Sequence, residues 1–149
     1  MLTESEIRTF IDGAIHYFAV SAGQPVEVGA PYLVTDGAPA AYDYLGVITV
    51  SGRRKGAVCF TAPRSMLIVL LMRMHETDTG DANIRDLVGE VANTISGNAR
   101  RDFGPEFQIS APSVVEPEGG KFWPPVEARP FVIPLTWRSH SAKLIVCLE

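Results

Sequence analysis

The sequence predicts an α+β fold, in which a largely antiparallel sheet of about six strands packs against two long helices and one shorter helix. Two long segments repeat apolar residues at the spacing of an amphipathic helix, and a shorter apolar segment between them also favours a helix. Six other runs are rich in strand-forming residues and are bounded by Gly, Pro or polar residues. Their order is helix, three strands, two helices and three strands, which is typical of the α+β class.

The first half of the chain predicts one helix and three strands. Residues 4–20 form the helix, which Thr3 or Ser5 can cap and which Gly23 and Pro25 close. Its apolar positions, which we expect to face the core, are Ile7, Phe10, Ile11, Ala14, Ile15 and Phe18. The predicted strands are 26–34, 44–50 and 56–61, and residues 52–55 form a solvated hairpin turn between the last two.

The second half predicts two helices and three strands. Pro63 suits the first turn of a helix over 64–74, which is apolar nearly all round and should therefore be deeply buried. A longer helix is predicted over 81–103, where Gly104 and Pro105 end it. The remaining predicted segments are strands over 107–115, 130–137 and 142–148, and a Pro/Gly-rich loop over 116–129.

Composition and charge limit the kinds of function. The 149 residues suit one domain, and we expect a single domain over 1–149 because no repeat or long linker divides the chain. The net charge of −4 disfavours a nucleic-acid partner, since phosphates would be repelled. The longest apolar run, 66–72, is far shorter than the roughly 20 residues of a membrane span. The first six residues lack the basic start and apolar core of a signal peptide.

The cysteines and histidines predict neither a disulfide nor a metal site. Cys59 and Cys147 each lie among strand-like apolar residues without metal-ligand spacing, which indicates reduced core thiols and a cytoplasmic location. His16, His75 and His140 are far apart, and we expect each at the surface or satisfied locally. The chain also lacks nucleotide-binding loops and the standard hydrolase and metalloprotease motifs.

The helix predicted over 81–103 carries the chemistry. Placing its residues about 100° apart puts Ile84, Val88, Val91 and Ile95 on one arc, the predicted core face. A nearly opposite arc, which we call the polar stripe, contains Asp86, Glu90, Asn93, Gly97 and Arg100. Asn and Gly cost a helix about 0.5 and 1 kcal/mol relative to Ala, so folding alone does not explain Asn93 and Gly97. The alternative is that Gly97 and Asn98 end the helix and Glu90 is one more solvated charge.

This helix resembles the signature helix of the CheX, CheC and FliY phosphatases. The match runs from Asp86 to Ala99 and follows their pattern of an acidic or Ser residue, Glu, Asn and Gly-Asn at fixed spacing. The likeness extends to residues 26–33, to the hairpin at 46–58 and to residues 112–115. The first helix has Glu6 followed three positions later by Thr9, so it lacks a Glu-x-x-Asn element. A single copy of this element favours the CheX branch.

The resemblance implies a phosphatase that acts on the phospho-aspartate of a CheY-like response regulator. Asn93 would hold the attacking water, and Glu90 would pair with a lysine of the regulator. Gly97 would allow close approach, and Asp86 and Asn98 would support binding. The resemblance further implies no cofactor of the chain's own, Mg²⁺ held by the regulator, and a homodimer joined through sheet edges. The strand over 131–137, rich in β-branched and aromatic residues, would supply a suitable edge.

Two other functions remain open from the sequence. A binding module of the same fold could dock a receiver domain without hydrolysis, because fold does not fix function. An unrelated small-molecule enzyme would need a concave site with convergent polar groups, for example one lined by His16, His75 or His140.

Overall fold

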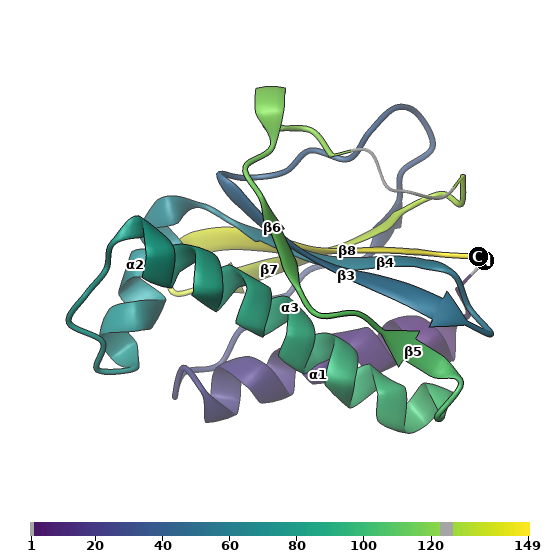
Figure 1. The fold of residues 1–149 in the computed structure, drawn as a ribbon, viewed down its shortest axis with the longest axis horizontal. Helices are drawn as coiled ribbons and strands as arrows, with labels where there is room; N and C mark the ends of the chain where they lie inside the picture. The colour runs from purple at the N-terminus through teal and green to yellow at the C-terminus, as the bar shows by residue number, and fades with distance from the viewer. Residues whose placement is uncertain (1, 123–126) are drawn as a thin grey trace.

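The computed structural model describes residues 2–122 and 127–149 and has three layers: helices, one sheet, and the loops that cover its other face (Figure 1). The helices are α1 (Glu4–Val20), α2 (Arg64–Arg73) and α3 (Asp81–Phe103), with a short 3-10 helix at Glu118–Gly120. The strands are β1 (Glu27–Val28), β2 (Tyr32–Leu33), β3 (Tyr44–Gly52), β4 (Gly56–Ala62), β5 (Phe107–Ile109), β6 (Ser113–Val115), β7 (Phe131–Trp137) and β8 (His140–Leu148). Among these described residues, no helix is both long and apolar enough to cross a membrane.

The eight strands form a single antiparallel sheet, which confirms the predicted α+β class. Its order is β1-β7-β8-β4-β3-β5, with β2 also paired to β7 and β6 also paired to β3. The sheet has eight strands rather than about six because two of the predicted strands are each divided. Pro31 interrupts the first, between β1 and β2, and Pro112 interrupts the second, between β5 and β6. Proline lacks the N–H that a continuous ladder requires.

The predicted edge strand over 131–137 lies inside the sheet. It is β7, which pairs with β8 on one side and with β1 and β2 on the other. The prediction of an edge there was therefore wrong, because the short strands that cover β7 could not be recognised as its partners from their own sequence. Within the described residues, β1 with β2 and β5 with β6 form the sheet borders. A homodimer joined through sheet edges stays a prediction.

The first two helices differ from the prediction in which residues they bury. Thr3 caps α1, and its side chain and that of Glu6 form a reciprocal capping box. Ile15, expected in the core, is 43% exposed, and Tyr17 takes the buried position instead. Ile15 lies about 140° around the helix from Phe10, beyond the edge of the buried face. Helix α2 is buried on one side only, since Met72 is 62% exposed.

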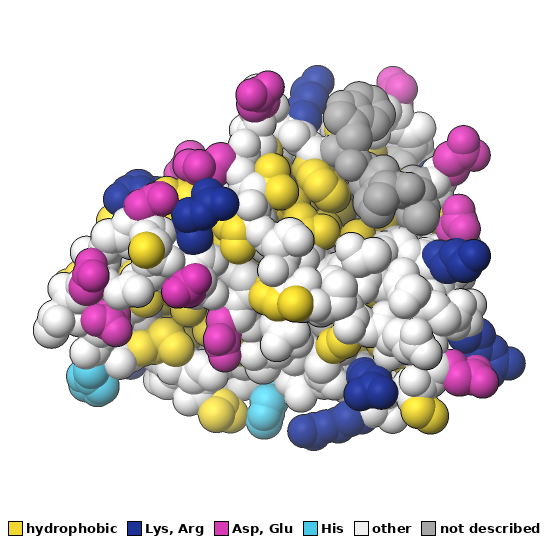
Figure 2. All heavy atoms as spheres, viewed as in Figure 1, with side chains coloured by type: hydrophobic (Ala, Val, Ile, Leu, Met, Phe, Trp, Pro, Cys, Tyr) yellow, Lys and Arg dark blue, Asp and Glu magenta, His cyan; other side chains and the backbone are white. Residues whose placement is uncertain are grey.

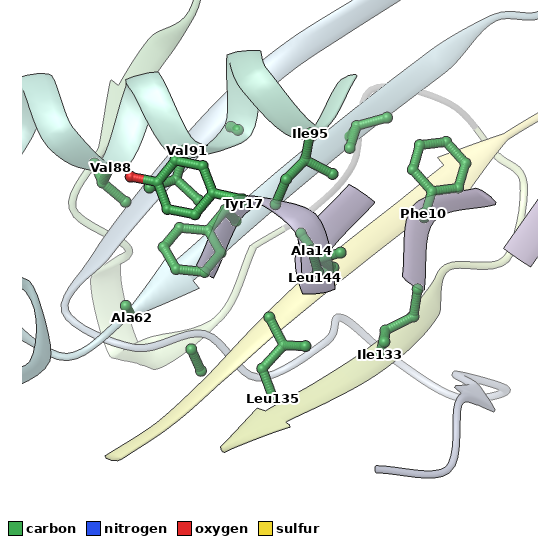
Figure 3. Close-up of a cluster of buried hydrophobic side chains, with 14 of the residues drawn as sticks. Phe10, Ala14, Tyr17, Ala62, Val88, Val91, Ile95, Ile133, Leu135 and Leu144 are labelled. Carbon is green, nitrogen blue, oxygen red and sulfur yellow. The ribbon is translucent and has the colours of Figure 1, made fainter. Parts of the chain in front are cut away.

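Apolar side chains cover both faces of the sheet. The larger core lies between the sheet and the three helices, and part of it is drawn in Figure 3. A smaller cluster on the opposite face consists of Leu45, Ala57, Cys59, Val132 and Ile145. The loops around Ala41 and Phe122 pack over it and are joined by a bridge between Ala40 and Lys121. Part of the predicted 116–129 loop, residues 123–126, lies outside the described residues. Cys59 and Cys147 are buried free thiols, as predicted.

Helix α3 lies directly against β3 because a glycine stands at the point of contact. A Cβ atom on Gly46 would be 2.4 Å from the backbone oxygen of Val88, far inside any normal contact distance. Gly89 faces β6 on the same side of the helix, and a Cβ there would meet Pro112 at 3.2 Å. The buried side chains Ile84, Val91 and Ile95 extend this contact along the helix. These close approaches set the position of α3 on the sheet.

We predict that Gly46→Ala destabilises the protein by about 3 kcal/mol, because the added methyl group meets backbone that cannot rotate away. Urea unfolding measures the effect. Thr49→Ala, at an exposed position on the same strand, is the control and should change stability by well under 1 kcal/mol. Equal stability of the Gly46→Ala protein and the wild type would show that α3 is not held at this contact.

Candidate functional site

The polar stripe lies on the outer surface of α3. Asp86, Glu90 and Asn93 are exposed, and Gly97 is partly exposed. Helix α3 continues without a break through Gly97 to Phe103, so the alternative that Gly97 and Asn98 end the helix is wrong. At about 1.5 Å per residue, the stripe from Asp86 to Arg100 is roughly 21 Å long.

Asn98 does not lie on the stripe. It is partly buried and faces α1, where its Cβ lies 3.9 Å from the position that a Cβ on Gly13 would occupy. The structure therefore brings together Asp86, Glu90, Asn93 and Gly97, and it places Asn98 at the neighbouring helix contact.

Charge changes sign along the stripe. Its first part is acidic, with Asp86 and Glu90, and its end is basic, with Arg100 and, next to it on the last turn of α3, Arg101. Figure 2 shows acidic side chains over the region where α3 begins, uncharged atoms over its middle, and basic side chains near its end. This order suits the helix dipole, which favours negative charge near the N-terminus and positive charge near the C-terminus. The dipole does not explain the neutral middle, where Asn93 and Gly97 lie.

The two glycines of α3 have different surroundings. A Cβ on Gly89 would contact β6, whereas a Cβ on Gly97 would have no atom of the described chain within 4 Å apart from its own helix. Packing in this chain therefore explains Gly89 but not Gly97. A bare patch of backbone next to Asn93 is a surface that another molecule can approach closely.

Polar contacts hold α3 near both ends. Near the first end, Arg85 pairs with Glu116 at 3.1 Å and donates to the carbonyl of Val114 at 3.2 Å. Near the other end, the Thr9 hydroxyl donates to Asp102 at 3.0 Å. The stripe is thus carried on a helix fixed to the sheet and to α1, which keeps its side chains in a constant arrangement.

Glu90 borders a pocket that the sequence analysis did not identify. The pocket lies between the three helices, and its walls include Tyr17 of α1, Leu71 of α2 and Leu87 of α3. No histidine lines it. Burial, together with the nearby negative charge of Glu90, raises the pKa of Tyr17 to about 12. The sequence analysis did not single out Tyr17, and nothing in the sequence connects it with Glu90.

Of the other titratable groups, Glu6, Arg53, Arg54 and Asp102 line a second pocket of about 340 Å³, and the histidines and cysteines lie apart from it. His16 and His75 are exposed, and His140 stacks on Trp137 with ring centroids 6.3 Å apart. Burial raises the pKa of Cys147 to about 11 and also raises that of Cys59, so both thiols stay protonated near neutral pH. Within residues 2–122 and 127–149, no three His, Cys, Asp or Glu side chains are grouped so that they could hold a metal ion.

Comparisons with known proteins agree with this fold. A family model described as "Chemotaxis phosphatase CheX" matches residues 44–136, which is more than half of the chain. A putative chemotaxis protein from Desulfovibrio vulgaris Hildenborough is 28% identical, with a TM-score of 0.85 and 97% of each chain covered. The chemotaxis protein CheX from Desulfovibrio desulfuricans is 25% identical, with a TM-score of 0.85, covering 97% of this chain and 99% of that one.

A more distant structure is a complex. The CheX-CheY-BeF3-Mg²⁺ complex from Borrelia burgdorferi contains a chain that is 16% identical, with a TM-score of 0.78 and 97% of each chain covered. At this identity the likeness shows the fold alone. The comparison with curated proteins found no match.

We predict that Gly97→Ala stabilises the isolated protein by about 1 kcal/mol, because alanine favours a helix and the methyl group meets no neighbour. Thermal unfolding should show a rise of about 3 °C. Gly89→Ala is the matched control on the same helix and should lower the melting temperature, since its methyl group meets β6. A lower melting temperature for Gly97→Ala would mean that this glycine serves the fold.

Titration of Tyr17 should make stability fall at high pH. In the unfolded chain the phenol has a pKa near 10, whereas in the folded chain it is about 12. Its stabilising contribution is complete below about pH 10 and is lost as the pH rises from 10 to 12. Across that range the unfolding free energy of the wild type should fall by about 2 kcal/mol more than that of Tyr17→Phe, measured with urea. If the unfolding free energies of the two proteins fell in parallel with pH, the raised pKa of Tyr17 in the folded chain would be refuted.

Proposed function

Because the chain belongs to the CheX chemotaxis phosphatase family, we propose that it hydrolyses the phospho-aspartate of a CheY-like response regulator. The observation that supports this most directly is the exposed amide of Asn93, which lies on a fixed helix with Glu90 one turn away. The uncharged middle of the stripe favours a phosphorylated ligand there, because a further carboxylate would repel it.

Asn93 is the proposed catalytic residue. Its amide carbonyl accepts a hydrogen bond from a water molecule and its NH₂ group donates one, so a single side chain can orient the water. The water oxygen attacks phosphorus, the bond between phosphorus and the aspartyl oxygen breaks, and its electron pair stays on the carboxylate. The water proton leaves with the phosphate product or the solvent. Catalysis of this kind depends on positioning rather than on covalent chemistry, which suits an amide.

The neighbouring residues of the stripe are proposed to bind the regulator. Glu90 pairs with the regulator's phosphate-contacting lysine and thereby sets the position in which the two proteins dock. Gly97 allows the regulator's backbone to come close, which accords with the open space around it. Asp86 adds negative charge one turn before Glu90. Asn98 supports the site through the α1 contact instead of touching the regulator.

The chain is proposed to need no cofactor of its own. The Borrelia burgdorferi complex contains CheX together with CheY and Mg²⁺. By analogy, Mg²⁺ belongs to the regulator, where it would offset negative charge on the phosphoryl oxygens. The residues of this chain then contribute the water-orienting amide and the docking charges. A cytoplasmic location, where such regulators act, also stays a prediction.

We predict that Asn93→Ala lowers kcat for phosphate release by about 100-fold and leaves binding nearly unchanged, because it removes the group that orients the water. Phosphate release from a phosphorylated CheY-like regulator measures kcat, and calorimetry measures binding. Gln108→Ala, which removes an exposed amide from β5 outside the stripe, is the control and should behave as the wild type.

Two outcomes would contradict the proposal in different ways. Full activity of the Asn93→Ala protein would remove Asn93 from the mechanism. Binding of the regulator by the wild type without faster phosphate release would identify a docking module instead of an enzyme. Glu90→Gln separates binding from chemistry, since it should raise KM by about tenfold and change kcat little.

A further inference from the structure

The pocket beside Glu90 contains an acidic group of residues and an apolar wall. It has a volume of about 280 Å³ and lies where α1, α2 and α3 meet. Three carboxylates line it: Glu76 after α2, and Asp86 and Glu90 on α3. Leu71, Met74 and Leu87 form the apolar part. A charged side chain with a long aliphatic stem has the matching shape and polarity.

None of these carboxylates is paired with a cation in the described part of the chain. The ion pairs there join Arg53 to Glu106, Arg54 to Glu6, Arg64 to Asp81 and Arg85 to Glu116. Glu76 accepts only a backbone hydrogen bond, from the N–H of Asp78 at 3.1 Å. Three negative charges therefore share one pocket without a positive partner from the described residues, which favours binding of a cation.

The Tyr17 hydroxyl is an independent indication of a ligand. Tyr17 is only 2% exposed, and its hydroxyl has no hydrogen-bond partner among the described residues. Figure 3 shows the hydroxyl turned away from α1 toward α3, near Val88 and Val91. A buried polar group without a partner is unfavourable, so phenylalanine would suit the isolated fold better. A buried hydroxyl without a partner in the described chain is available to a ligand that reaches it.

We propose that this pocket receives a lysine or arginine side chain of the regulator, separate from the lysine that pairs with Glu90. The aliphatic stem of the incoming side chain lies along Leu71, Met74 and Leu87. Its charged end pairs with Glu76 and Asp86 and donates a hydrogen bond to the Tyr17 hydroxyl. The phenol of Tyr17 is protonated at neutral pH, as any phenol with its ordinary pKa near 10 is, and burial and Glu90 raise its pKa further. Its oxygen is then a neutral acceptor for the incoming cation.

This inference rests on the proposed function and adds a specificity determinant to it. Asn93 and Glu90 are directed at the regulator's phosphorylation site, which all receiver domains have. The pocket instead contacts the regulator's surface outside that site. A regulator with a basic residue at the matching position would bind tightly, and one with an acidic residue there would be repelled.

The first experiment compares Tyr17→Phe and Glu76→Gln with the wild type in phosphate release from a phosphorylated regulator. Each variant should raise KM by about fivefold with kcat within about twofold, because the pocket binds the partner without contacting the phosphoryl group. Glu118→Gln, which removes an exposed charge on the short 3-10 helix, is the control for general electrostatics and should leave KM unchanged. Tyr17→Phe should also keep or raise the melting temperature at neutral pH, since the lost hydroxyl has no partner in the isolated chain.

The outcomes are distinct. Unchanged KM in both variants would overturn the proposal. A clear fall in the melting temperature of Tyr17→Phe would also overturn it, by showing that the hydroxyl serves the fold. Reduced kcat with unchanged KM would assign Tyr17 to the chemistry instead of to partner binding, and would equally overturn the pocket as a docking site.

A second experiment tests the pocket without any regulator. Butylammonium and ethylguanidinium are titrated into the protein while the methyl signals of Leu71, Met74 and Leu87 are followed by NMR. Saturable shifts that are absent with neutral pentanol and weaker in Glu76→Gln would support the cation site; identical shifts with pentanol would overturn it. Binding of these probes without binding of any phosphorylated receiver would leave the pocket standing and reject the proposed function. Faster phosphate release from a receiver, without probe binding and with unchanged KM in both variants, would support the proposed function and reject the pocket as a docking site.

Discussion

The contact between the backbone of α3 and β3 is the constraint on which the site depends. Gly46 lets the helix lie against the strand, and Gly89 does the same beside β6. With the helix at this distance, Ile84, Val88, Val91 and Ile95 are fully buried. Burial of four such side chains is worth about 6–12 kcal/mol, which is far more than any single surface interaction. Rotation of α3 would expose them and bury carboxylates, so the outward direction of the polar stripe follows from the packing beneath it.

The same helix therefore serves two purposes on its two sides. On the inner side, the space between the helix and the sheet limits the size of each side chain, as the close approach of Gly89 to Pro112 shows. Few substitutions fit there. The outer side carries residues that weaken the helix, such as Asn93 and Gly97, and the isolated chain gains nothing from them. A position where stability alone would select another residue is a useful guide to function. The hydroxyl of Tyr17, buried without a partner, is a further position of this type.

The sequence predicted the parts that depend on local patterns. The limits of α3, the hairpin between β3 and β4, and the Thr3 cap all follow from periodicity and from residues with strong conformational preferences. The divided strands were missed because Pro31 and Pro112 act within otherwise apolar runs. Ile15 was wrongly assigned to the core, and the burial of Tyr17 was missed, because the periodic pattern does not fix the edge of a buried face. The pocket could not be foreseen, since it joins the end of α1 to residues that come about 50 to 77 positions later in the chain.

The place of β8 in the sheet affects how the protein forms during synthesis. β8 lies between β4 and β7, and it is the last of the described strands to be made. Until it emerges from the ribosome, β4 and the β7 group are two separate half-sheets, each with a long unpaired apolar edge. Helix α3 has then been fully synthesised, but only part of the sheet beneath it has formed. A nascent chain at this stage has an aggregation-prone surface and is a natural client for chaperones, although the finished sheet covers those edges.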